Sequence, residues 1–325
     1  MKVLLLERID DAGMRLLLDA GFEVDLAPDY SEEMLLGLVA DYDAILVRAM
    51  IPITAKLIRA AKKCRIISRH GVGLETIDLT AATECGIPVA YTPGANANAV
   101  AEHTVSLILD VLKQNVRFSR RLMEQGDYAC RFHVRNEELR GKTVGILGLG
   151  NIGVRTAKIL SHGFGAKIIG YSPHATLERF ARMEVNGRLA VSMEDLLENS
   201  DIVSLHLPGN RAGIINRDTL AKMKPGSILI NTSRGSLVDE VALYEALTNG
   251  HLAGAGLDVT ASEPPETDNP LFALENIVIT PHTAALTREA LQTMATGSAG
   301  QIVDYLMQDR MPWGLANPEV WEKRK

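Results

Sequence analysis

The chain has 325 residues, a length that indicates two domains rather than a single core. Its composition, 46% hydrophobic and 23% charged, is ordinary for a soluble globular protein, and the formal net charge of -6 argues against a nucleic-acid surface and against an anionic membrane surface. No run of about 18 apolar residues predicts a membrane span. The three cysteines, Cys64, Cys85 and Cys130, share no metal-type spacing and fit free thiols in a reducing cytoplasm, which is the expected location.

The first part of the chain alternates short apolar runs with helical patterns. The run Val3–Leu6 is too short for the core of a signal peptide and predicts a buried strand. Asp10 is expected to cap the helix that follows, with Met14, Leu17 and Leu18 among its apolar positions. Further strands are predicted at Ala44–Val47, Arg65–Ser68 and Pro88–Tyr91. Alternation of this kind indicates a parallel sheet with helices on its faces.

A long helical pattern then runs from Ala99 to Gln125. Its apolar residues recur at helical spacing; they are Val105, Ile108, Leu109, Leu112 and Val116. After Gly141 the alternation of strands and helices restarts, and it continues to a final helix at about Thr287–Met307. The strands predicted in this part are Thr143–Leu147, Lys167–Tyr171, Ile202–Leu205, Ser227–Asn231, Gly254–Leu257 and Ile277–Thr280.

The first strand after Gly141 runs into a glycine loop, Gly148-Leu149-Gly150-Asn151-Ile152-Gly153. The G-x-G-x-x-G pattern alone is weak, but a strand before it, a helix after it and another strand beyond supply the context of a dinucleotide-binding turn. Gly148 permits the tight turn, Gly150 lets the backbone approach a pyrophosphate, and Gly153 lets the helix pack closely on the strand. The helix N-terminus adds N–H donors and a positive dipole end. A glycine turn in another kind of α/β protein is the alternative.

Two alternating stretches separated by a long helix predict an α/β fold of two doubly wound, Rossmann-like domains. The dinucleotide-binding domain is placed at 98–288. It is inserted into a smaller outer domain formed by 1–97 and 289–325, and the catalytic cleft is expected between the two. No internal repeat of solenoid length is visible.

The end of the second strand of such a domain normally carries an acid that binds the adenosine ribose hydroxyls. Here the sequence is Tyr171-Ser172-Pro173-His174, and Ser172 takes the acidic position. A serine removes the repulsion that an acid exerts on a 2′-phosphate, and His174 is able to contact that phosphate. Ser172 therefore favours NADP, while an NAD enzyme with a weaker ribose contact remains the alternative because no arginine lies in the turn.

Three polar segments each follow a predicted strand and are expected at the carboxyl edge of the sheet, where open α/β folds bind ligands. They contain Arg234, Glu263 and His282. Arg234 can bind a substrate carboxylate through two parallel hydrogen bonds. His282 can donate a proton to a carbonyl oxygen while a hydride arrives from nicotinamide, and it takes the hydroxyl proton in the reverse direction. Glu263 can hold the second ring nitrogen and favour the protonated imidazole. A structural histidine and a solvated glutamate are the alternatives.

Together these motifs resemble the D-isomer-specific 2-hydroxyacid dehydrogenase family, and the resemblance covers nearly the whole chain. The segments that carry it are Gly148–Gly153, Asn231–Gly235 with Val238-Asp239, Leu257–Val259 with Glu263-Pro264, and Pro281-His282 with Thr287 and Glu289. The resemblance implies Arg234 as the substrate-binding arginine, His282 as the acid/base and Glu263 as its partner. It also implies the two-domain layout, with a flavodoxin-like substrate domain.

The resemblance further implies substrate contacts in the outer domain. The segment Arg69–Asp78 resembles the family's glycine loop, whose backbone N–H groups around Val72 and Gly73 bind the substrate carboxylate. Asn96 matches a position near the substrate in phosphoglycerate dehydrogenases, and Arg48 resembles the arginine that faces the substrate phosphate there. A solvated arginine at a strand end is the alternative for Arg48.

Cofactor contacts, with NAD or NADP as the cofactor, are expected from the glycine loop, from the turn after the second strand and from the later loops. The residues are Gly148, Gly150, Asn151, Ile152, Gly153, Ser172, Pro173, His174, His206, Leu207, Pro208, Thr232, Ser233, Asp258 and Ala284. His206 is expected to be positional rather than catalytic. No metal site is expected, because no His/Cys/Asp cluster has metal-ligand spacing and hydride transfer needs no metal.

Some positions depart from the family pattern. Besides Ser172, Asn136 stands where many members have glycine, and Gly213 stands where a polar residue is common. The sequence ends shortly after Trp321, so the C-terminal regulatory domain of many phosphoglycerate dehydrogenases, and serine feedback through it, are not expected. None of these departures touches Arg234, Glu263 or His282.

The expected reaction is hydride transfer between NAD(P)H and a small 2-oxo acid, giving the D-2-hydroxy acid, or the reverse. Arg48 and the outer-domain segments favour a phosphoglycerate-like or hydroxypyruvate/glyoxylate-like substrate, with a D-lactate-type enzyme as an alternative. A dinucleotide-sensing corepressor of the same fold is the alternative from another class, disfavoured by the absence of a flexible tail. Formate dehydrogenase is disfavoured because its histidine partner is a glutamine.

The helix at Ala99–Gln125 resembles the segment through which these enzymes dimerise. We therefore expect a homodimer through this region, and no nucleic-acid or membrane partner. An interdomain hinge helix is the alternative, and both roles are compatible. Side-chain selectivity depends on the shape of the pocket, so the sequence leaves the physiological substrate and the direction of the reaction open.

Overall fold

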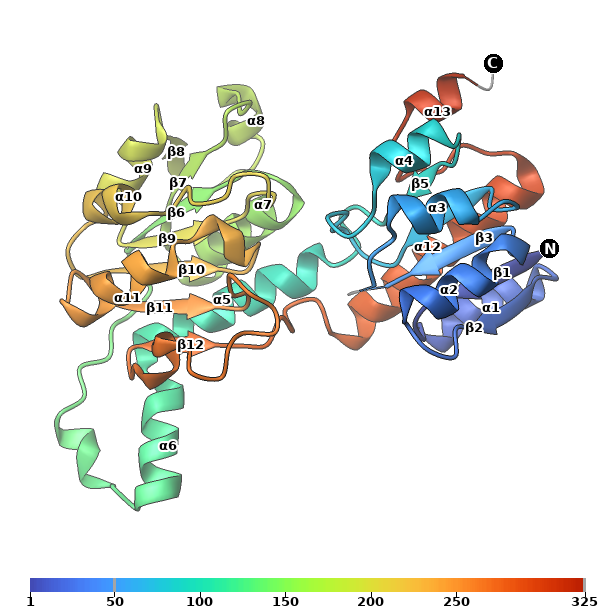
Figure 1. Cartoon of the computed structure of the whole chain (residues 1–325). Coiled ribbons are helices and arrows are strands. Elements are labelled where there is room, and N and C mark those ends of the chain that lie inside the picture. Colours follow the sequence, from blue (N-terminus) through green and yellow to red (C-terminus); the bar gives the residue numbers. More distant parts are fainter. Residues whose placement is uncertain (49–50, 324–325) are drawn as a thin grey trace. The chain divides into compact units, whose positions relative to one another are not determined.

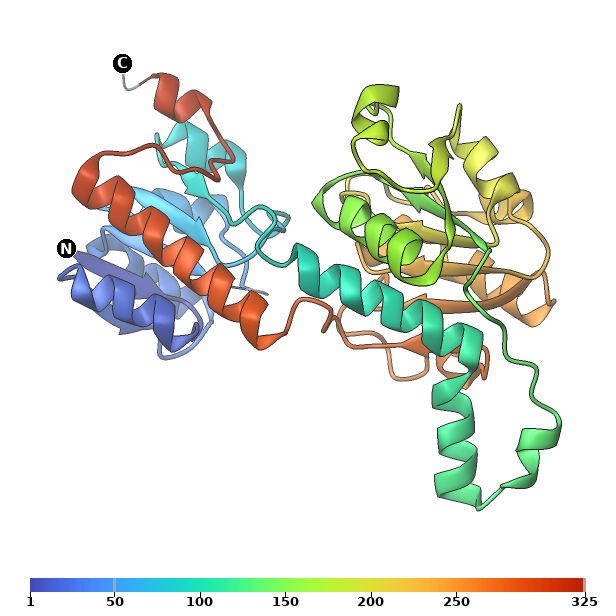
Figure 2. The same ribbon diagram turned by 180° about the vertical axis from the view of Figure 1, so that it is seen from behind.

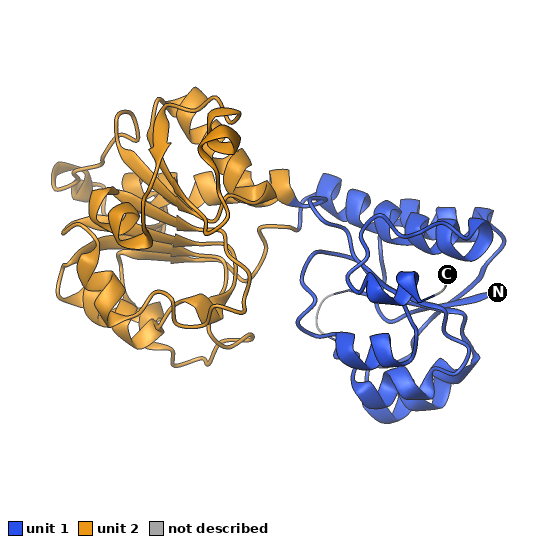
Figure 3. Cartoon of the chain, turned by 90° about the horizontal axis from the view of Figure 1, so that it is seen from above, with its two compact units in different colours: residues 1–96, 286–325 blue, residues 97–285 orange. Residues whose placement is uncertain are grey.

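The computed structural model describes residues 1–48 and 51–323. The chain divides into two compact units, unit 1 (Met1–Asn96 with Leu286–Lys325) and unit 2 (Ala97–Ala285), so that it passes from one unit to the other twice (Figure 3). The expected outer domain, 1–97 with 289–325, ends one residue later and resumes three residues later than unit 1.

Unit 1 is built on a five-stranded sheet in the order β2-β1-β3-β4-β5, in which every pairing is parallel (Figure 1). The strands are β1 (Lys2–Leu5), β2 (Glu23–Leu26), β3 (Ala44–Val47), β4 (Ile66–Arg69) and β5 (Val89–Ala90). This is the flavodoxin-like strand order expected for the outer domain.

Helices cover both faces of this sheet. They are α1 (Asp11–Asp19), α2 (Glu32–Leu38), α3 (Ala55–Ala60), α4 (Leu79–Glu84), α12 (Arg288–Gln308) and α13 (Glu319–Glu322), with a short turn of 3-10 helix at Val39–Asp41. Val3 and Leu5 belong to the core under α1 and α12, whereas Leu4 belongs to the core under α2, α3 and α4. Because both faces of β1 are buried, its sequence is apolar throughout rather than alternating. A Cβ added to Gly13 would lie 2.7 Å from the carbonyl oxygen of Ala295, so α1 and α12 pack with their backbones close together.

Unit 2 is built on a seven-stranded parallel sheet in the order β12-β11-β10-β9-β6-β7-β8. The strands are β6 (Thr143–Leu147), β7 (Lys167–Tyr171), β8 (Gly187–Leu189), β9 (Ile202–Leu205), β10 (Ser227–Asn231), β11 (Leu252–Leu257) and β12 (Ile277–Ile279). Counted from β6, this is the Rossmann order with a seventh strand added. The strand order reverses between β6 and β9, which is the switch point where such sheets bind ligands.

Helices also cover both faces of the sheet of unit 2 (Figures 1 and 2). They are α5 (Ala97–Lys113), α6 (Asn115–Gln125), α7 (Asn151–Lys158), α8 (Leu177–Ala181), α9 (Met193–Asn199), α10 (Arg217–Lys222) and α11 (Glu240–Thr248). Short 3-10 helices lie at Ala129–Phe132, Gly235–Leu237 and Pro270–Ala273, and a π-helical turn at Ile159–Gly163. Helices α5 and α7 share one core with β6, and α9, α10 and α11 share the other with β9 and β10. No described helix is long and apolar enough to cross a membrane.

The expectation of one continuous helix from Ala99 to Gln125 is wrong. Gln114 adopts a left-handed conformation, with φ of 52°, and this residue ends α5 and begins α6. No residue of α6 is buried, so packing on the sheet does not hold α6 in line with α5. Figures 1 and 2 show α6 leaving the sheet of unit 2 at an angle to α5.

Most of the predicted strands are confirmed, and five of them have the predicted bounds. These five are Ala44–Val47, Thr143–Leu147, Lys167–Tyr171, Ile202–Leu205 and Ser227–Asn231. Asp10 caps α1 as expected, since its side chain accepts from the backbone N–H of Ala12. The apolar face of α1 is narrower than predicted, because Leu17 is fully buried but Leu18 is 53% exposed.

Candidate active site

The glycine loop closes on itself through contacts that only glycine permits. Gly148 has φ of 109°, and a Cβ there would lie 2.1 Å from the carbonyl oxygen of His206. Its N–H donates to the carbonyl oxygen of Tyr171 at 2.8 Å. A Cβ on Gly153 would lie 2.0 Å from the carbonyl oxygen of Gly148. The loop therefore lies directly against the segment that follows β9.

The N-terminus of α7 is left open by this loop. Gly150 is the N-cap residue of α7, and no side chain caps the first turn. An added Cβ on Gly150 would meet nothing within 4 Å, so the space beside it is free of protein atoms. Uncapped N–H groups beside open space form an anion-binding site, which suits the pyrophosphate of a dinucleotide.

Ser172, Pro173 and His174 follow β7, the strand next to β6. The carbonyl oxygen of Ser172 accepts from the N–H of Ala175 at 3.0 Å, which forms a turn. The side chain of Ser172 is half-buried, and His174 is exposed. The structure thus puts a hydroxyl group, and no carboxylate, at the end of the second strand.

His206 follows β9 and sits at the switch point. Its N–H donates to the carbonyl oxygen of Leu147, and its Nε2 lies 3.0 Å from Oγ of Ser204. Its Nδ1 is buried and forms no hydrogen bond with any residue that the structure describes. Burial lowers the pKa of His206 to about 3, so the ring is neutral at physiological pH. A buried ring nitrogen without a protein partner fits a polar group of a bound ligand.

Asn231, which sequence reasoning assigned to no role, fixes the segment that carries Arg234. Its Oδ1 accepts from the N–H of Ser233 at 3.0 Å, and its Nδ2 donates to the carbonyl oxygen of Arg234 at 2.9 Å. The side chains of Thr232 and Ser233 are held by the protein itself. Oγ of Ser233 donates to the carbonyl oxygen of Leu205 at 2.6 Å, and Thr232 Oγ1 lies 2.8 Å from Oγ1 of Thr104.

The segment carrying Arg234 packs against the loop that follows β11. A Cβ on Gly235 would lie 1.8 Å from the carbonyl oxygen of Thr260, so the two loops touch backbone to backbone. Arg234 is half-buried, and its Nη1 donates to the carbonyl oxygen of Ser233 at 2.7 Å. Gly235 therefore fixes Arg234 relative to the loop that carries Glu263.

Glu263 and His282 form a direct pair. Oε2 of Glu263 lies 2.7 Å from Nδ1 of His282, and Oε1 accepts from the N–H of Thr260 at 3.4 Å. The side chains are partly exposed, 29% for Glu263 and 49% for His282. His282 has φ of 52°, an uncommon conformation for a residue with a side chain, and such strain is concentrated at functional sites.

Asp258 holds the turn that carries His282. The carboxylate is 1% exposed and accepts from Oγ1 of Thr280 at 2.6 Å and from the N–H groups of Thr283 and Ala284 at 2.9 Å. Burial by itself raises the pKa of this carboxyl group, but hydrogen bonds from His103, Thr280, Ala284 and Thr283 outweigh it and hold the pKa below its ordinary value. Asp258 is therefore ionised, and most of its hydrogen-bonding capacity is taken up by donors within the protein.

The expected substrate residues lie in unit 1, at the carboxyl ends of its strands. Arg48 follows β3, and its Nη1 donates to the carbonyl oxygen of Arg8 at 3.1 Å. No hydrogen bond within the described chain uses the backbone N–H of Val72 or Gly73. Oδ1 of Asn96 is buried and has no hydrogen-bond partner among the described residues. The backbone N–H groups of Val72 and Gly73 are those to which the family resemblance assigns the substrate carboxylate.

The structure brings the expected residues of unit 2 to one edge of its sheet. The glycine loop follows β6, His206 follows β9, Arg234 follows β10, Glu263 follows β11 and His282 follows β12. Sequence reasoning gave no role to Asn231, Thr280 or His103. Asn231 and Thr280 form hydrogen bonds with the backbone of Arg234 and His282, and His103 contacts Thr280 and Asp258. A polar residue at the end of an apolar strand was the available signal for Asn231 and Thr280.

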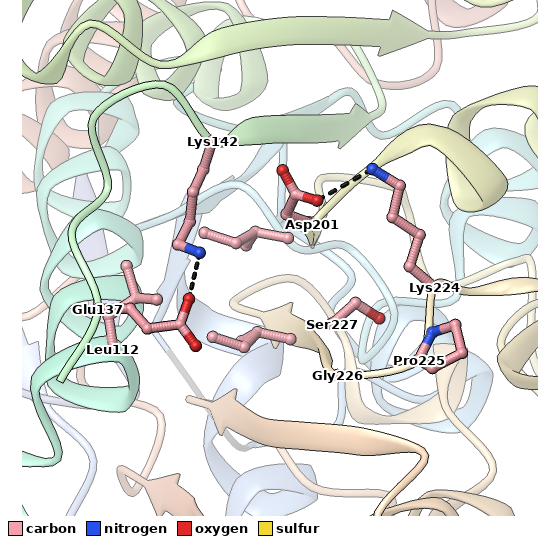
Figure 4. Close-up of a pocket in the computed structure, with 10 residues that line it drawn as sticks. Leu112, Glu137, Lys142, Asp201, Lys224, Pro225, Gly226 and Ser227 are labelled. Atoms are coloured by element: carbon pink, nitrogen blue, oxygen red, sulfur yellow. Dashed lines mark hydrogen bonds and ion pairs between the residues drawn. The ribbon is translucent and has the colours of Figure 1, made fainter. Parts of the chain in front are cut away.

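A cavity of about 90 Å³ in unit 2 lies at the opposite, amino edge of the sheet. Figure 4 shows Lys142 pointing to Glu137 and Lys224 to Asp201 at this cavity, so both lysines are already paired. Lys142 precedes β6 and Asp201 precedes β9, and the catalytic candidates lie beyond the other ends of the strands. This cavity is therefore no part of the candidate active site. The described residues contain no group of three His, Cys, Asp or Glu side chains placed to hold a metal.

The fold and the glycine loop of unit 2 define a dinucleotide-binding α/β protein. Residues 105–284 match the model of the D-isomer specific 2-hydroxyacid dehydrogenase, NAD binding domain. The chain is 39% identical over 306 residues to D-3-phosphoglycerate dehydrogenase of Archaeoglobus fulgidus, a match that covers 94% of this chain and 57% of that protein. It is 40% identical over 301 residues to glyoxylate reductase of Thermofilum pendens, covering 90% of this chain and 87% of that protein.

The chain is also similar to a solved structure of a related reductase. The NADPH-dependent glyoxylate/hydroxypyruvate reductase from Sinorhizobium meliloti, crystallised with citrate, superposes with a TM-score of 0.86 at 26% identity, covering 98% of both chains. The chain belongs to the D-isomer specific 2-hydroxyacid dehydrogenase family, which confirms the resemblance drawn from its motifs. It spans about half the length of the curated D-3-phosphoglycerate dehydrogenases that it matches.

Proposed function

We propose that the protein is a nicotinamide-dependent D-2-hydroxyacid dehydrogenase that interconverts a small 2-oxo acid and the corresponding D-2-hydroxy acid. The observation that carries this proposal is the 2.7 Å pair between Glu263 and His282, at the carboxyl edge of the sheet whose glycine loop fits a pyrophosphate. The cofactor, when bound, supplies or accepts the hydride. The protein supplies the proton and the binding of the substrate.

His282 is the proposed acid/base, since half of its side chain is exposed while Nδ1 is taken by Glu263. Nε2 is then the atom that gives a proton to the substrate oxygen during reduction and takes it back during oxidation. Glu263 stabilises the imidazolium and fixes the ring orientation. Arg234 binds the substrate carboxylate, because a guanidinium offers N–H donors in a planar fork that matches two carboxylate oxygens.

The remaining substrate contacts are proposed for unit 1. The unused N–H groups of Val72 and Gly73 suit an oxyanion of the substrate carboxylate, and Asn96, after β5, offers the buried Oδ1 that has no partner among the described residues. Arg48 places a positive charge at the end of β3, which favours a substrate with a second anionic group. A phosphoglycerate-like substrate uses that charge, and a hydroxypyruvate- or glyoxylate-like substrate does not need it; the names of both matching relatives agree with these two classes.

A substrate panel tests this proposal. Oxidation of NADPH and NADH is followed with phosphorylated and unphosphorylated 2-oxo acids, for the wild type and for Arg48→Gln. Turnover with at least one 2-oxo acid is expected. A phosphorylated substrate predicts a raised KM in Arg48→Gln, whereas a glyoxylate-like substrate predicts an unchanged one. The absence of turnover with every 2-oxo acid would refute the proposed activity.

For the cofactor, we propose a preference for NADP over NAD. A hydroxyl group at Ser172 leaves no negative charge to repel a 2′-phosphate, and the exposed ring of His174 lies in the same turn. The proposed contacts to the rest of the cofactor are the unpartnered Nδ1 of His206, Leu207 beside the glycine loop, Pro208, Oδ2 of Asp258, and the loops at Thr232, Ser233 and Ala284. Oδ2 of Asp258 accepts from Ala284 N–H and retains a lone pair for a further donor.

We further propose a homodimer that buries α6 and the turn after it. Helix α6 has no buried residue, and large apolar side chains are exposed on it and on residues 128–132, which follow it. The exposed fractions are 48% for Leu122, 78% for Met123, 64% for Tyr128 and 76% for Phe132. An apolar patch of this kind marks an interaction surface. A second copy of the chain is the proposed occupant, since the same segment resembles the dimerising region of the family.

A further inference from the structure

His103, a residue of α5, reaches the turn that carries the proposed acid/base. Its Nε2 lies 3.0 Å from Oγ1 of Thr280 and 3.4 Å from Oδ1 of Asp258. The side chain is mostly buried, with 23% exposed, although α5 lies on a face of the sheet and not at its carboxyl edge. None of the roles proposed above uses this ring.

The direction of each hydrogen bond follows from the charge of Asp258. An ionised carboxylate only accepts, so the hydroxyl group of Thr280 donates its hydrogen to Oδ1 at 2.6 Å. Oγ1 of Thr280 has then spent its one hydrogen and can only accept from His103. Nε2 of His103 therefore carries a hydrogen, whichever state Nδ1 is in. The result is a chain of donors that runs from His103 through Thr280 to Asp258.

Asp258 in turn holds the backbone at His282 and at the two residues that follow it. The N–H of His282 donates to the carbonyl oxygen of Asp258 at 2.8 Å, and the next two N–H groups, of Thr283 and Ala284, donate to its carboxylate. These bonds stabilise the left-handed conformation of His282, which an isolated chain disfavours. The orientation of the His282 ring toward Glu263 depends on this turn.

We propose that His103 is a positioning residue for His282, acting as a neutral or charged N–H donor that fixes Thr280 and Asp258 beneath the turn. The proposal rests on the acid/base role assigned to His282 above. It assigns no contact between His103 and the substrate. The hydrogen bond to Thr280, and not the charge of the ring, is the feature that matters.

Two pairs of variants test the donor chain. His103→Leu removes the donor, whereas His103→Gln places an amide N–H near the position of Nε2. Thr280→Val removes the hydroxyl group with little change of volume, whereas Thr280→Ser keeps it. Both removing variants are expected to lower kcat about tenfold or more, the factor that loss of a buried hydrogen bond corresponds to. Both conserving variants are expected to stay near the wild type.

An NMR measurement reads the position of His282 without turnover. In protein labelled with ¹⁵N at histidine, the hydrogen shared between Nδ1 of His282 and Glu263 gives a downfield resonance that is assigned by its loss in His282→Gln. The resonance is expected to vanish or broaden in His103→Leu and in Thr280→Val, and to persist in His103→Gln and Thr280→Ser. If His103→Leu does not fold, Thr280→Val still measures the effect of breaking the donor chain on this resonance.

The outcomes separate this inference from the proposed function. If the wild type turns over no 2-oxo acid, the proposed function fails, and the NMR resonance alone decides whether His103 positions His282. If the enzyme is active, an unchanged resonance or an unchanged kcat in both removing variants overturns the inference. Failure of His103→Gln to restore both readouts overturns it as well, because the charge of the ring would then be the feature that matters.

Discussion

Nδ1 of His282 lies 2.7 Å from Oε2 of Glu263, although 19 residues separate them along the chain. The two side chains come from loops that follow neighbouring strands, β11 and β12, so the register of the parallel sheet brings them together. Arg234 lies on the loop of the next strand, β10, which is locked to the β11 loop where Gly235 meets Thr260. This geometry fixes the ring of His282 through Nδ1, so the proposed acid/base role falls to Nε2.

Glu263→Gln and His282→Gln are expected to lower kcat by different amounts. Removal of the imidazole deletes the proton donor, which is worth on the order of 10²–10⁴ in rate. Glu263→Gln keeps a hydrogen bond to Nδ1 but loses the negative charge that stabilises the imidazolium, so a smaller loss, about tenfold, is expected. Steady-state kinetics and a fluorescence titration with dinucleotide measure both effects.

Dinucleotide affinity should stay within about twofold of the wild type in both variants, because neither side chain belongs to the glycine loop. Glu266→Gln supplies a matched control, since Glu266 is an exposed acid on the loop that follows β11 and carries Glu263. Near-normal turnover in His282→Gln would remove the residue from the role assigned to it.

Gly150→Ala should weaken dinucleotide binding, whereas Gly153→Ala should lower the stability of the fold. Gly150 has φ of -82°, which alanine adopts freely, and the added methyl group meets no protein atom, so the fold should keep its stability. The methyl group fills the space for the pyrophosphate, and affinity for the dinucleotide should fall about tenfold or more. In Gly153→Ala the methyl group would lie 2.0 Å from the carbonyl oxygen of Gly148, so a loss of about 1–3 kcal/mol of stability is expected.

Thermal unfolding and dinucleotide titration distinguish the two glycine variants, with Gly163→Ala as a control because its added methyl group also meets open space. Unchanged dinucleotide binding in Gly150→Ala would contradict the placement of the pyrophosphate at the N-terminus of α7.

Stability should decrease as the pH falls through the weakly acidic range, because His70 is buried in its neutral form. Burial, with a smaller contribution from the charge of Arg48, lowers the pKa of His70 from 6.5 to about 4. Below pH 6.5 His70 takes up a proton in the unfolded chain, whereas in the folded chain it stays neutral until about pH 4. The contribution of His70 to the free energy of unfolding is therefore complete above pH 6.5 and declines by about 1.4 kcal/mol per pH unit between pH 6.5 and about pH 4.

His70→Gln removes this proton uptake and retains an N–H group to donate to the carbonyl oxygen of Leu291. Chemical unfolding at several pH values should show a shallower decline for His70→Gln than for the wild type. The exposed His133→Gln should show the wild-type slope. Equal slopes for all three proteins would mean that His70 is protonated as easily in the folded chain as in the unfolded one.

Ser172→Asp is expected to shift the cofactor preference toward NADH. The new carboxylate repels a 2′-phosphate and is able to accept hydrogen bonds from the ribose hydroxyls of NAD. A change of about tenfold or more in the ratio of kcat/KM for NADPH to that for NADH corresponds to one such charged contact. Ser172→Asn, which adds similar bulk without charge, separates the two effects, and an unchanged ratio in Ser172→Asp would place the discrimination elsewhere.

The mass in solution should be twice the 35.3 kDa of one chain. Met123→Glu combined with Phe132→Glu places charge in the exposed apolar surface of the α6 region and should give monomers by light scattering. Val241→Glu, at an apolar residue of α11 that is 68% exposed, should leave the dimer intact. A monomeric wild type would refute the dimer, and a dimer that survives the double variant would place the interface elsewhere.

The central strands could be predicted from the sequence because both of their faces are buried. Runs such as Ile202–Leu205 carry apolar side chains throughout, a pattern that requires no knowledge of the partners. The edge strands β2 and β8 were missed because they are largely exposed and contain charged residues. The end of α5 at Gln114 was also missed. The apolar spacing before Gln114 gave no sign that none of the residues of α6 would be buried.

The residue types of the candidate site could be predicted because the chemistry and the family motifs both demand them. The pairing of Glu263 with His282 followed from those types. The support beneath them could not be predicted in the same way, because His103 and Thr280 are 177 residues apart and no sequence pattern links the two. Hydrogen-bond partners of this kind become visible only when the sheet has brought the strands together.

Transfer of the isotope from labelled cofactor to product tests the central claim most directly. The protein is incubated with a 2-oxo acid from the panel and with NAD(P)H that carries deuterium at the transferable position, and the product is analysed by mass spectrometry and chiral chromatography. The expected product is a D-2-hydroxy acid with one deuterium at C2, formed by the wild type and at least about 10²-fold more slowly by His282→Gln. A product without deuterium, or one of the L configuration, would contradict it.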